Sequence, residues 1–180
     1  TESVGIGNKA LYAQTTGRNT AVGFNAGLDV TTGTQNTLLG GEAGENITTG
    51  NQNVAVGTQS LRANTTASYS TAVGYQASFN NTTGEMNDAH GYRVLHSNTT
   101  GSYNVGIGGD ALHNNTTATN NTALGYRALF SNSTASNNTA VGYKAGLSNT
   151  TGVRNAWYGY EAGQANTAGS DNAGKTYAFE

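Results

Sequence analysis

The chain of 180 residues carries little charge, with 10% charged residues, and contains 26 glycines, no proline and no cysteine. A net charge of −2 and eight scattered Lys and Arg residues exclude the basic patch that nucleic-acid binding requires. The sequence has no apolar run of about 18 residues, which excludes a membrane-spanning helix, and its lack of cysteine excludes a disulfide framework. Ten tyrosines, one tryptophan and regularly placed Val, Ile and Leu residues indicate a buried interior rather than a disordered chain.

A seventeen-residue unit repeats along the chain, and residues 138–154, NTAVGYKAGLSNTTGVR, show it clearly. Numbering the unit from its first Asn, a glycine at position 5 marks each of ten copies. These are Gly7, Gly23, Gly40, Gly57, Gly74, Gly91, Gly108, Gly125, Gly142 and Gly159, so the first spacing is sixteen and the other eight are seventeen. A short period over nearly the whole chain is typical of a solenoid. We assign residues 1–171 to a solenoid repeat domain of ten coils and residues 172–180 to a divergent C-terminal tail or capping segment.

Three segments follow one another within each unit. The first, T-A-V-G-Y (residues 139–143 in the copy quoted), alternates and is partly β-branched, which predicts a half-buried strand. The second, G-Y-x-A-L, has a spacing that permits either a second strand or a single helical turn. The third, N-T-T-G, has the composition of a turn. The whole unit is too short for a helix–turn–helix repeat.

These segments predict an all-β fold, a parallel β-solenoid (β-roll) in which every strand pairs with copies of itself. Identical positions then form ladders, with aliphatic residues at position 4, hydrogen-bonded Asn at positions 1 and 12, and Thr at positions 13 and 14. Small residues at positions 3, 5 and 8 fit a narrow interior, and the glycine at position 5 predicts a bend or a close backbone approach. One apolar residue per coil fills the interior, from position 9 or, beside Gly27 and Gly146, from Leu28 and Leu147 at position 10.

A thin solenoid has a small core for its surface and exposes strand edges at its ends. Self-association corrects both faults, so we expect either a homotrimer or end-to-end stacking into a filament.

The motifs SVGIG at 3–7, NVAVG at 53–57 and NVGIG at 104–108 resemble the S-V-A-I-G motif of trimeric autotransporter adhesin heads. The fuller pattern N-T-A-V-G-Y-x-A-L-x-x-N-T-T-G is similar to repeats of phage tail-fibre proteins. The resemblance covers residues 3 to about 171. It implies a β-roll that assembles as a homotrimer on a virion or cell surface.

No constellation of residues indicates catalysis, and we predict no enzyme activity and no catalytic, cofactor-binding or metal-binding residues. Two G-x-G-x-x-A matches, beginning at Gly5 and Gly106, are products of the repeat rather than a dinucleotide fingerprint. His90 occupies the aliphatic position 4. Three copies of it on a trimer axis could bind a metal or an anion, but we favour a tolerated substitution. His96 and His113 share position 10 and should be stacked neighbours without a third ligand.

Three further patterns have a structural and a functional interpretation. N-x-[ST] sequons begin at Asn46, Asn64, Asn81, Asn98, Asn115, Asn132 and Asn149; they would place glycans on one face, but a simple turn motif is favoured. Adjacent threonines at positions 13 and 14 lack the T-x-T spacing of a flat ice-binding strand. Tyrosines at position 6 would form either a sticky or sugar-stacking surface or, as we favour, packing between coils or protomers.

These expectations converge on a structural role, a tail-fibre or filament shaft that provides reach and rigidity with weak adhesion along its ladders. The alternatives are an adhesin head that binds a host glycan or matrix, and a subunit of a self-assembling extracellular filament. The expected partners are copies of the chain itself and, for the adhesin, a host-surface glycan; nucleic acid, membrane and cofactors are not expected. The expected location is extracellular or on the virion surface.

Overall fold

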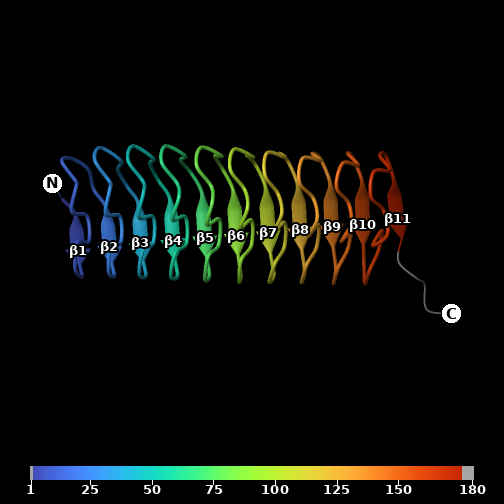
Figure 1. Ribbon diagram of the computed structural model, residues 1–180, viewed down its shortest axis with the longest axis horizontal. Helices are drawn as coiled ribbons and strands as arrows, with labels where there is room; N and C mark the ends of the chain where they lie inside the picture. The colour runs from blue at the N-terminus through green and yellow to red at the C-terminus, as the bar shows by residue number, and fades with distance from the viewer. Residues whose placement is uncertain (1, 176–180) are drawn as a thin grey trace.

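The computed structural model describes residues 2–175 as a parallel β-solenoid with one strand of three residues in each coil. Eleven strands form one sheet in the order of the chain, so that β1 lies at one end of a rod and β11 at the other (Figure 1). This confirms the all-β solenoid predicted from the repeat. The strands are β1 (Val4–Ile6), β2 (Thr20–Val22), β3 (Thr37–Leu39), β4 (Val54–Val56), β5 (Thr71–Val73), β6 (Asp88–His90), β7 (Val105–Ile107), β8 (Thr122–Leu124), β9 (Thr139–Val141), β10 (Ala156–Tyr158) and β11 (Ala173–Lys175).

Every strand pairs in parallel with the next strand of the chain, at the same position of the repeat. In β2 and β3, for example, Thr20 lies opposite Thr37 and Val22 opposite Leu39. Strands in a sheet lie about 4.8 Å apart, so ten such steps make the rod about 48 Å long. The register confirms that each strand pairs with copies of itself.

The two faces of the sheet differ in burial. In β2–β10 the middle residue of the strand, at position 3 of the repeat, points inward, as Ala55 and Ala72 do with no exposed surface, whereas positions 2 and 4 point outward. Positions 8 and 9 complete the interior, and Ala128 and Leu129 are fully buried there. Small residues at positions 3 and 8 therefore do line a narrow core, as predicted.

The segment after the strand is neither a second strand nor a helical turn. It is a chain of turns in which positions 7 and 9 adopt left-handed backbone conformations, with φ of 60° at Gln59 and 48° at Leu61. Their amide groups bond to different neighbours: Leu61 N donates to Ala77 O of the following coil, and Gln59 N to Gly41 O of the preceding coil. Left-handed conformations are costly for residues other than glycine. They persist here because hydrogen bonds on both sides hold them.

The glycine at position 5 lies where successive coils approach most closely. Gly57 has a φ of 126°, and a Cβ added to it would lie 2.6 Å from the carbonyl oxygen of Gly74 in the next coil. No other residue fits this position without displacing backbone. The prediction of a bend with a close backbone approach is confirmed.

Two ladders of buried asparagines run along the rod. At position 1, Asn36 N and Nδ2 both donate to Asn19 Oδ1 of the preceding coil, and Asn36 Nδ2 also donates to Gly50 O of its own coil. At position 12, Asn98 Nδ2 donates to Asn81 Oδ1 and to the carbonyl of Gly101 in its own coil. These bonds satisfy backbone groups that would otherwise be buried without partners, which explains asparagine in a fold where its strand propensity is poor.

The sequence prediction for the apolar filling is correct at position 9 and wrong at position 10. Leu28 and Leu147 are only half-buried. Where position 9 is glycine, larger residues from positions 3 and 12 occupy the space instead. A Cβ on Gly27 would meet Leu38 Cδ1 at 2.7 Å and Val30 Cγ2 at 3.2 Å, and one on Gly146 would meet Trp157 Cε3 at 2.6 Å.

The segment assigned by sequence to a C-terminal tail begins as a continuation of the repeat. Strand β11 pairs with β10, with Ala173 opposite Ala156. Asn172 occupies position 1 and donates through N and Nδ2 to Asn155 Oδ1, both at 3.0 Å. Residues 176–180, the rest of the predicted tail, lie outside the described part of the chain.

Candidate interaction surface

The outward side of the sheet presents a continuous stripe of side chains at positions 2 and 4 of β1–β10, which we call the outer sheet face. Position 4 carries an aliphatic residue in eight of these ten strands, and several remain exposed in the single chain: Ile6 by 58%, Ile107 by 44% and Val22 by 37%. Position 2 is mostly Thr or Val. Contiguous exposed apolar surface of this kind marks an interaction site more often than a free surface.

Beside this face runs an aromatic stripe at position 6, the tyrosine ladder, whose members are Phe24, Tyr75, Tyr92, Tyr126, Tyr143 and Tyr160. The rings of Tyr126 and Tyr143 stack at 5.7 Å between centroids, and those of Tyr143 and Tyr160 at 5.2 Å. All remain substantially exposed. The rings cover one another's faces and leave their edges to solvent, so the geometry suits packing against an apolar partner better than stacking on a sugar.

The outer sheet face has one polar interruption, in β6. Asp88 at position 2 is exposed and His90 at position 4 is half-buried, while Ala89 between them is fully buried. Their neighbours along the sheet are Thr71 and Val105 beside Asp88, and Val73 and Ile107 beside His90. Within residues 2–175, neither side chain makes a hydrogen bond or an ion pair. His90 thus faces outward, away from the core.

A second group of unusual residues lies at position 10. The rings of Phe79, His96, His113 and Phe130 form a stack with centroids 5.1–5.3 Å apart. The predicted stacking of His96 on His113 is confirmed, with 2° between the ring planes. Burial, followed by the nearby His113 and Arg93, lowers the pKa of His96 from its ordinary value. The stack therefore favours the neutral form of the His96 imidazole.

Charged residues at position 7 flank this aromatic stack. Arg93 Nη2 contacts His113 Nε2, while His113 Nδ1 lies 2.8 Å from Asn114 Oδ1, so both ring nitrogens are engaged. Arg127 lies over the ring of Phe130, and its Nε is 3.5 Å from Asp110 Oδ2. The contacts of Arg93 and Asn114 therefore hold the His113 ring in place within the stack.

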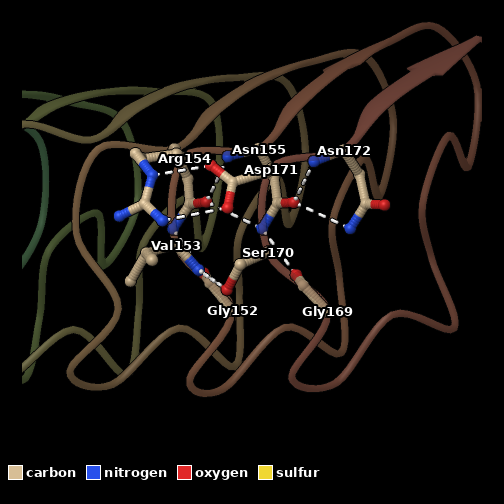
Figure 2. Close-up of polar contacts among 9 residues, drawn as sticks. Gly152, Val153, Arg154, Asn155, Gly169, Ser170, Asp171 and Asn172 are labelled. Carbon is tan, nitrogen blue, oxygen red and sulfur yellow. Dashed lines mark hydrogen bonds and ion pairs between the residues drawn. The ribbon is translucent and has the colours of Figure 1, made fainter.

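On another edge of the rod, polar groups from position 15 of one coil to position 1 of the next link successive coils (Figure 2). Val153 N donates to Ser170 Oγ, and Arg154 Nε and Nη2 donate to the two carboxylate oxygens of Asp171 at 2.6 and 2.9 Å. Arg154 lowers the pKa of the Asp171 carboxyl through these bonds. The pair is well exposed to solvent and contributes little stability.

Six of the seven sequons predicted above lie in the wrong place for glycosylation of the folded chain. Asn64, Asn81, Asn98, Asn115, Asn132 and Asn149 have no exposed surface, and Asn46 is half-buried. The Nδ2 of Asn98 is engaged by two acceptors within the solenoid. A glycan on any of the six fully buried asparagines would require that part of the ladder to open.

The threonines at positions 13 and 14 behave differently from each other. At position 13, Thr48 Oγ1 donates to the carbonyl of Thr65 in the next coil. At position 14, Thr49 and Thr66 are exposed. Only one of the two threonine columns therefore presents free hydroxyls, which does not provide the paired array of an ice-binding face.

Neither G-x-G-x-x-A match lies at the start of a helix. The segment from Gly5 contains the end of β1, and the segment from Gly106 the end of β7, each followed by turns. Over the described residues, no three His, Cys, Asp or Glu side chains of the one chain converge as a metal site. No helix in residues 2–175 is long and apolar enough to cross a membrane.

Comparisons of the chain with protein-family models, with curated proteins and with solved structures gave no significant match. The surface of the solenoid itself is therefore the basis for a proposed function.

Proposed function

We propose that the chain is a segment of a fibre on a virion or cell surface and that it assembles as a homotrimer through the outer sheet face. The observation that carries this proposal is the run of exposed and half-buried aliphatic residues along the sheet. Burying apolar surface stabilises an assembly by about 25 cal/mol per Å². In a single chain this apolar surface remains in contact with water, so the stabilisation is not gained.

A second copy of the chain is the occupant that fits this face best. The face repeats about every 4.8 Å along the rod, so side chains of another solenoid can interdigitate with it at every coil. A partner without that period matches it at one or two coils only. The apolar character and the absence of charge on the face, outside β6, also suit an interface between identical chains.

The tyrosine ladder is needed in the same interface. A sheet about 48 Å long and roughly 10 Å wide, from three residues at about 3.3 Å each, offers roughly 480 Å². A standard protein interface covers about 800 Å² per partner. The adjacent tyrosines supply the additional apolar area, which agrees with their exposure in the single chain.

The work of such an assembly is reach and rigidity. Nine successive coils, from residue 19 to residue 171, have the same length and carry no inserted loop that could form a receptor-binding tip. This regularity supports a shaft over an adhesin head. The extracellular or virion-surface location and the trimeric state are part of the proposal, and they agree with the resemblance to tail-fibre and adhesin repeats.

Substitution of charged residues into the outer sheet face tests the proposal directly. Val56 and Val73 occupy position 4 in adjacent coils, and Thr49 and Thr66 occupy the exposed position 14. We expect light scattering to give the unmodified chain three times its single-chain mass of 18.4 kDa. Val56→Lys with Val73→Lys should give monomers, and Thr49→Lys with Thr66→Lys should leave the trimer intact. Retention of the trimer in the first variant, or its loss in the second, would contradict the proposal.

A second candidate, end-to-end stacking into a filament, is favoured by the direction of the hydrogen bonds. In each coil the amides at positions 9 and 11 donate to the following coil, as Leu61 does to Ala77 O, while those at positions 5 and 7 donate to the preceding coil. The two ends of the rod therefore present complementary sets of donors and acceptors. Growth of the mean mass with concentration beyond that of a trimer, with filaments in electron micrographs, would establish stacking in addition to the trimer.

A further inference from the structure

The β6 interruption, Asp88 and His90, is the least expected feature of the outer sheet face. In β1–β10 these are the only carboxylate and the only imidazole at positions 2 and 4; the other strands carry Thr, Val, Ala, Ile, Leu or Tyr there. Both side chains project from the same side of one strand, because Ala89 between them points into the core. Aspartate is also among the least favoured residues in strands.

Self-association through this face would bury the pair, so this inference rests on the proposed function. A carboxylate taken out of water is strongly destabilising unless another group compensates its charge. The residues beside it cannot do so: Thr71 and Val105 flank Asp88, and Val73 and Ile107 flank His90. Within residues 2–175, no hydrogen bond or ion pair joins Asp88 to His90 either, so the compensating group comes from outside the chain.

Carboxylate oxygen and imidazole nitrogen together are the donor set of divalent transition-metal sites. Alternate residues of a strand lie about 6.6 Å apart, a separation that two side chains can close around one ion. One chain supplies only two donors, in agreement with the absence of any group of three within residues 2–175. Three chains in the same register supply six, three nitrogens and three oxygens.

We propose that Asp88 and His90 of three chains together bind one divalent transition-metal ion, with Zn²⁺ as the probe, at β6 of the assembled fibre. The ion offsets two of the three negative charges that the buried carboxylates bring together. It also fixes the axial register of the three chains, which a face of identical repeats would otherwise allow to slip by a whole coil. An ion at a single coil specifies one register.

The test uses the tag-free full-length chain, stripped of metal with EDTA and dialysed, then titrated calorimetrically with Zn²⁺ while its mass is followed by light scattering. The expected result is one Zn²⁺ per three chains. Asp88→Thr with His90→Val restores the residues that other coils carry at these positions, so this variant should fold and trimerise but bind Zn²⁺ at least tenfold more weakly. A matched control, His96→Phe with His113→Phe, removes the other two histidines and should bind Zn²⁺ like the unmodified chain.

Each outcome separates this inference from the proposed function. A trimer that binds no Zn²⁺, or that binds it equally well in the Asp88→Thr, His90→Val variant, overturns the metal site and leaves the fibre proposal standing. Such a trimer would pair Asp88 with His90 of a neighbouring chain by a hydrogen bond, without an ion. A monomer at all concentrations, with or without Zn²⁺, overturns both.

Discussion

The coils of residues 87–137 and those of residues 138–171 fill the same interior in two different ways. In the first region each coil has a small residue at position 3 and a leucine at position 9, and Leu95, Leu112 and Leu129 are all fully buried. In the second region position 9 is Gly146 or Gly163, and Trp157 at position 3 occupies the space that two leucines would fill. The repeat therefore conserves the volume of the interior rather than the residue at any one position.

A similar exchange appears near the N-terminus, where it also changes polarity. Leu38 at position 3 fills part of the space beside Gly27 and Gly44. The rest is filled by Val30 and Ile47, which stand at position 12 in place of asparagine. The ladder at position 1, by contrast, always has a hydrogen-bonding side chain, including Ser3 and Ser70. The difference indicates that the position 1 ladder is essential and the position 12 ladder is not.

The largest expected effect on stability comes from removing the Trp157 side chain from the interior of residues 138–171. Trp157→Ala leaves a cavity and should lower the free energy of unfolding by about 3–5 kcal/mol. Gly146→Leu in the unmodified chain should also destabilise, because its Cβ would lie 2.6 Å from Trp157 Cε3. The triple variant Trp157→Ala, Gly146→Leu, Gly163→Leu should recover most of the stability that Trp157→Ala alone loses. Urea unfolding followed by circular dichroism measures all of these variants.

The backbone does not prevent this rescue. Gly146 has a φ of 61°, close to the 51° of Leu112 and Leu129 at the same position. If leucines at 146 and 163 fail to compensate for the loss of Trp157, the volume exchange between positions 3 and 9 is not the rule of this fold.

The next largest expected effect on stability distinguishes the asparagine ladder at position 1 from the one at position 12. Asn104→Val at position 1 removes Oδ1, the acceptor for Asn121 N, and Nδ2, a donor to Ala118 O. Each buried group left without a partner costs about 1–3 kcal/mol, so we expect a loss of about 2–4 kcal/mol.

The matched variant is Asn115→Val at position 12, where Val30 occurs naturally. Ala118 O then keeps its bond from Asn104 Nδ2, and we expect a loss of about 1 kcal/mol. Equal losses in the two variants, measured by urea unfolding, would contradict the distinction between the ladders.

A smaller effect tests volume exchange inside the leucine region itself. Val94 at position 8 is larger than the usual alanine, and it fits because Gly106 replaces alanine at position 3 of the next coil. A Cβ on Gly106 would lie 2.5 Å from Val94 Cγ1, so Gly106→Ala should destabilise by about 1–3 kcal/mol. Val94→Ala in the same chain should remove most of that cost. Thermal melts in which Gly106→Ala alone is neutral would refute the pairing.

The smallest effect concerns the histidines of the leucine region and depends on pH. The pKa of His96 is lowered in the folded chain, mainly by burial and then by His113 and Arg93. Below the ordinary value of 6.5 the unfolded chain takes up a proton that folded His96 does not, so the free energy of unfolding falls as pH decreases through that value.

His96→Phe, which extends the Phe79 end of the stack, should reduce this loss. The measurement is the urea midpoint at pH 7.5 and at pH 5.0 for both chains. An unchanged difference between the two pH values would show that His96 does not contribute.

The sequence predicted the coil, its register and the asparagine ladders because each depends only on the period and on local chemistry. It failed at Leu28 and Leu147, since the side chains that compensate a glycine come from a neighbouring coil, which a single-coil comparison does not include. The turns after the strand are not predictable from the sequence, because non-glycine residues with positive φ, such as Gln59 and Leu61, have no sequence signature.

The candidate surface was only partly predictable. The aliphatic residue at position 4 was expected in a ladder, but a pattern of alternation does not say which side of the strand faces the core. The repeat pattern does not single out Asp88, because it occupies position 2, where no strict pattern holds. Its importance follows only from sharing the outer side of β6 with His90.

The central claim is that the outer sheet face is covered by copies of the same chain. The most direct test is the mass of the unmodified chain by light scattering, combined with its maximum dimension by small-angle X-ray scattering. A mass three times the single-chain 18.4 kDa, with a length near the roughly 48 Å expected for the stacked strands, is the predicted result. A stable monomer of 18.4 kDa at micromolar and millimolar concentrations would contradict it.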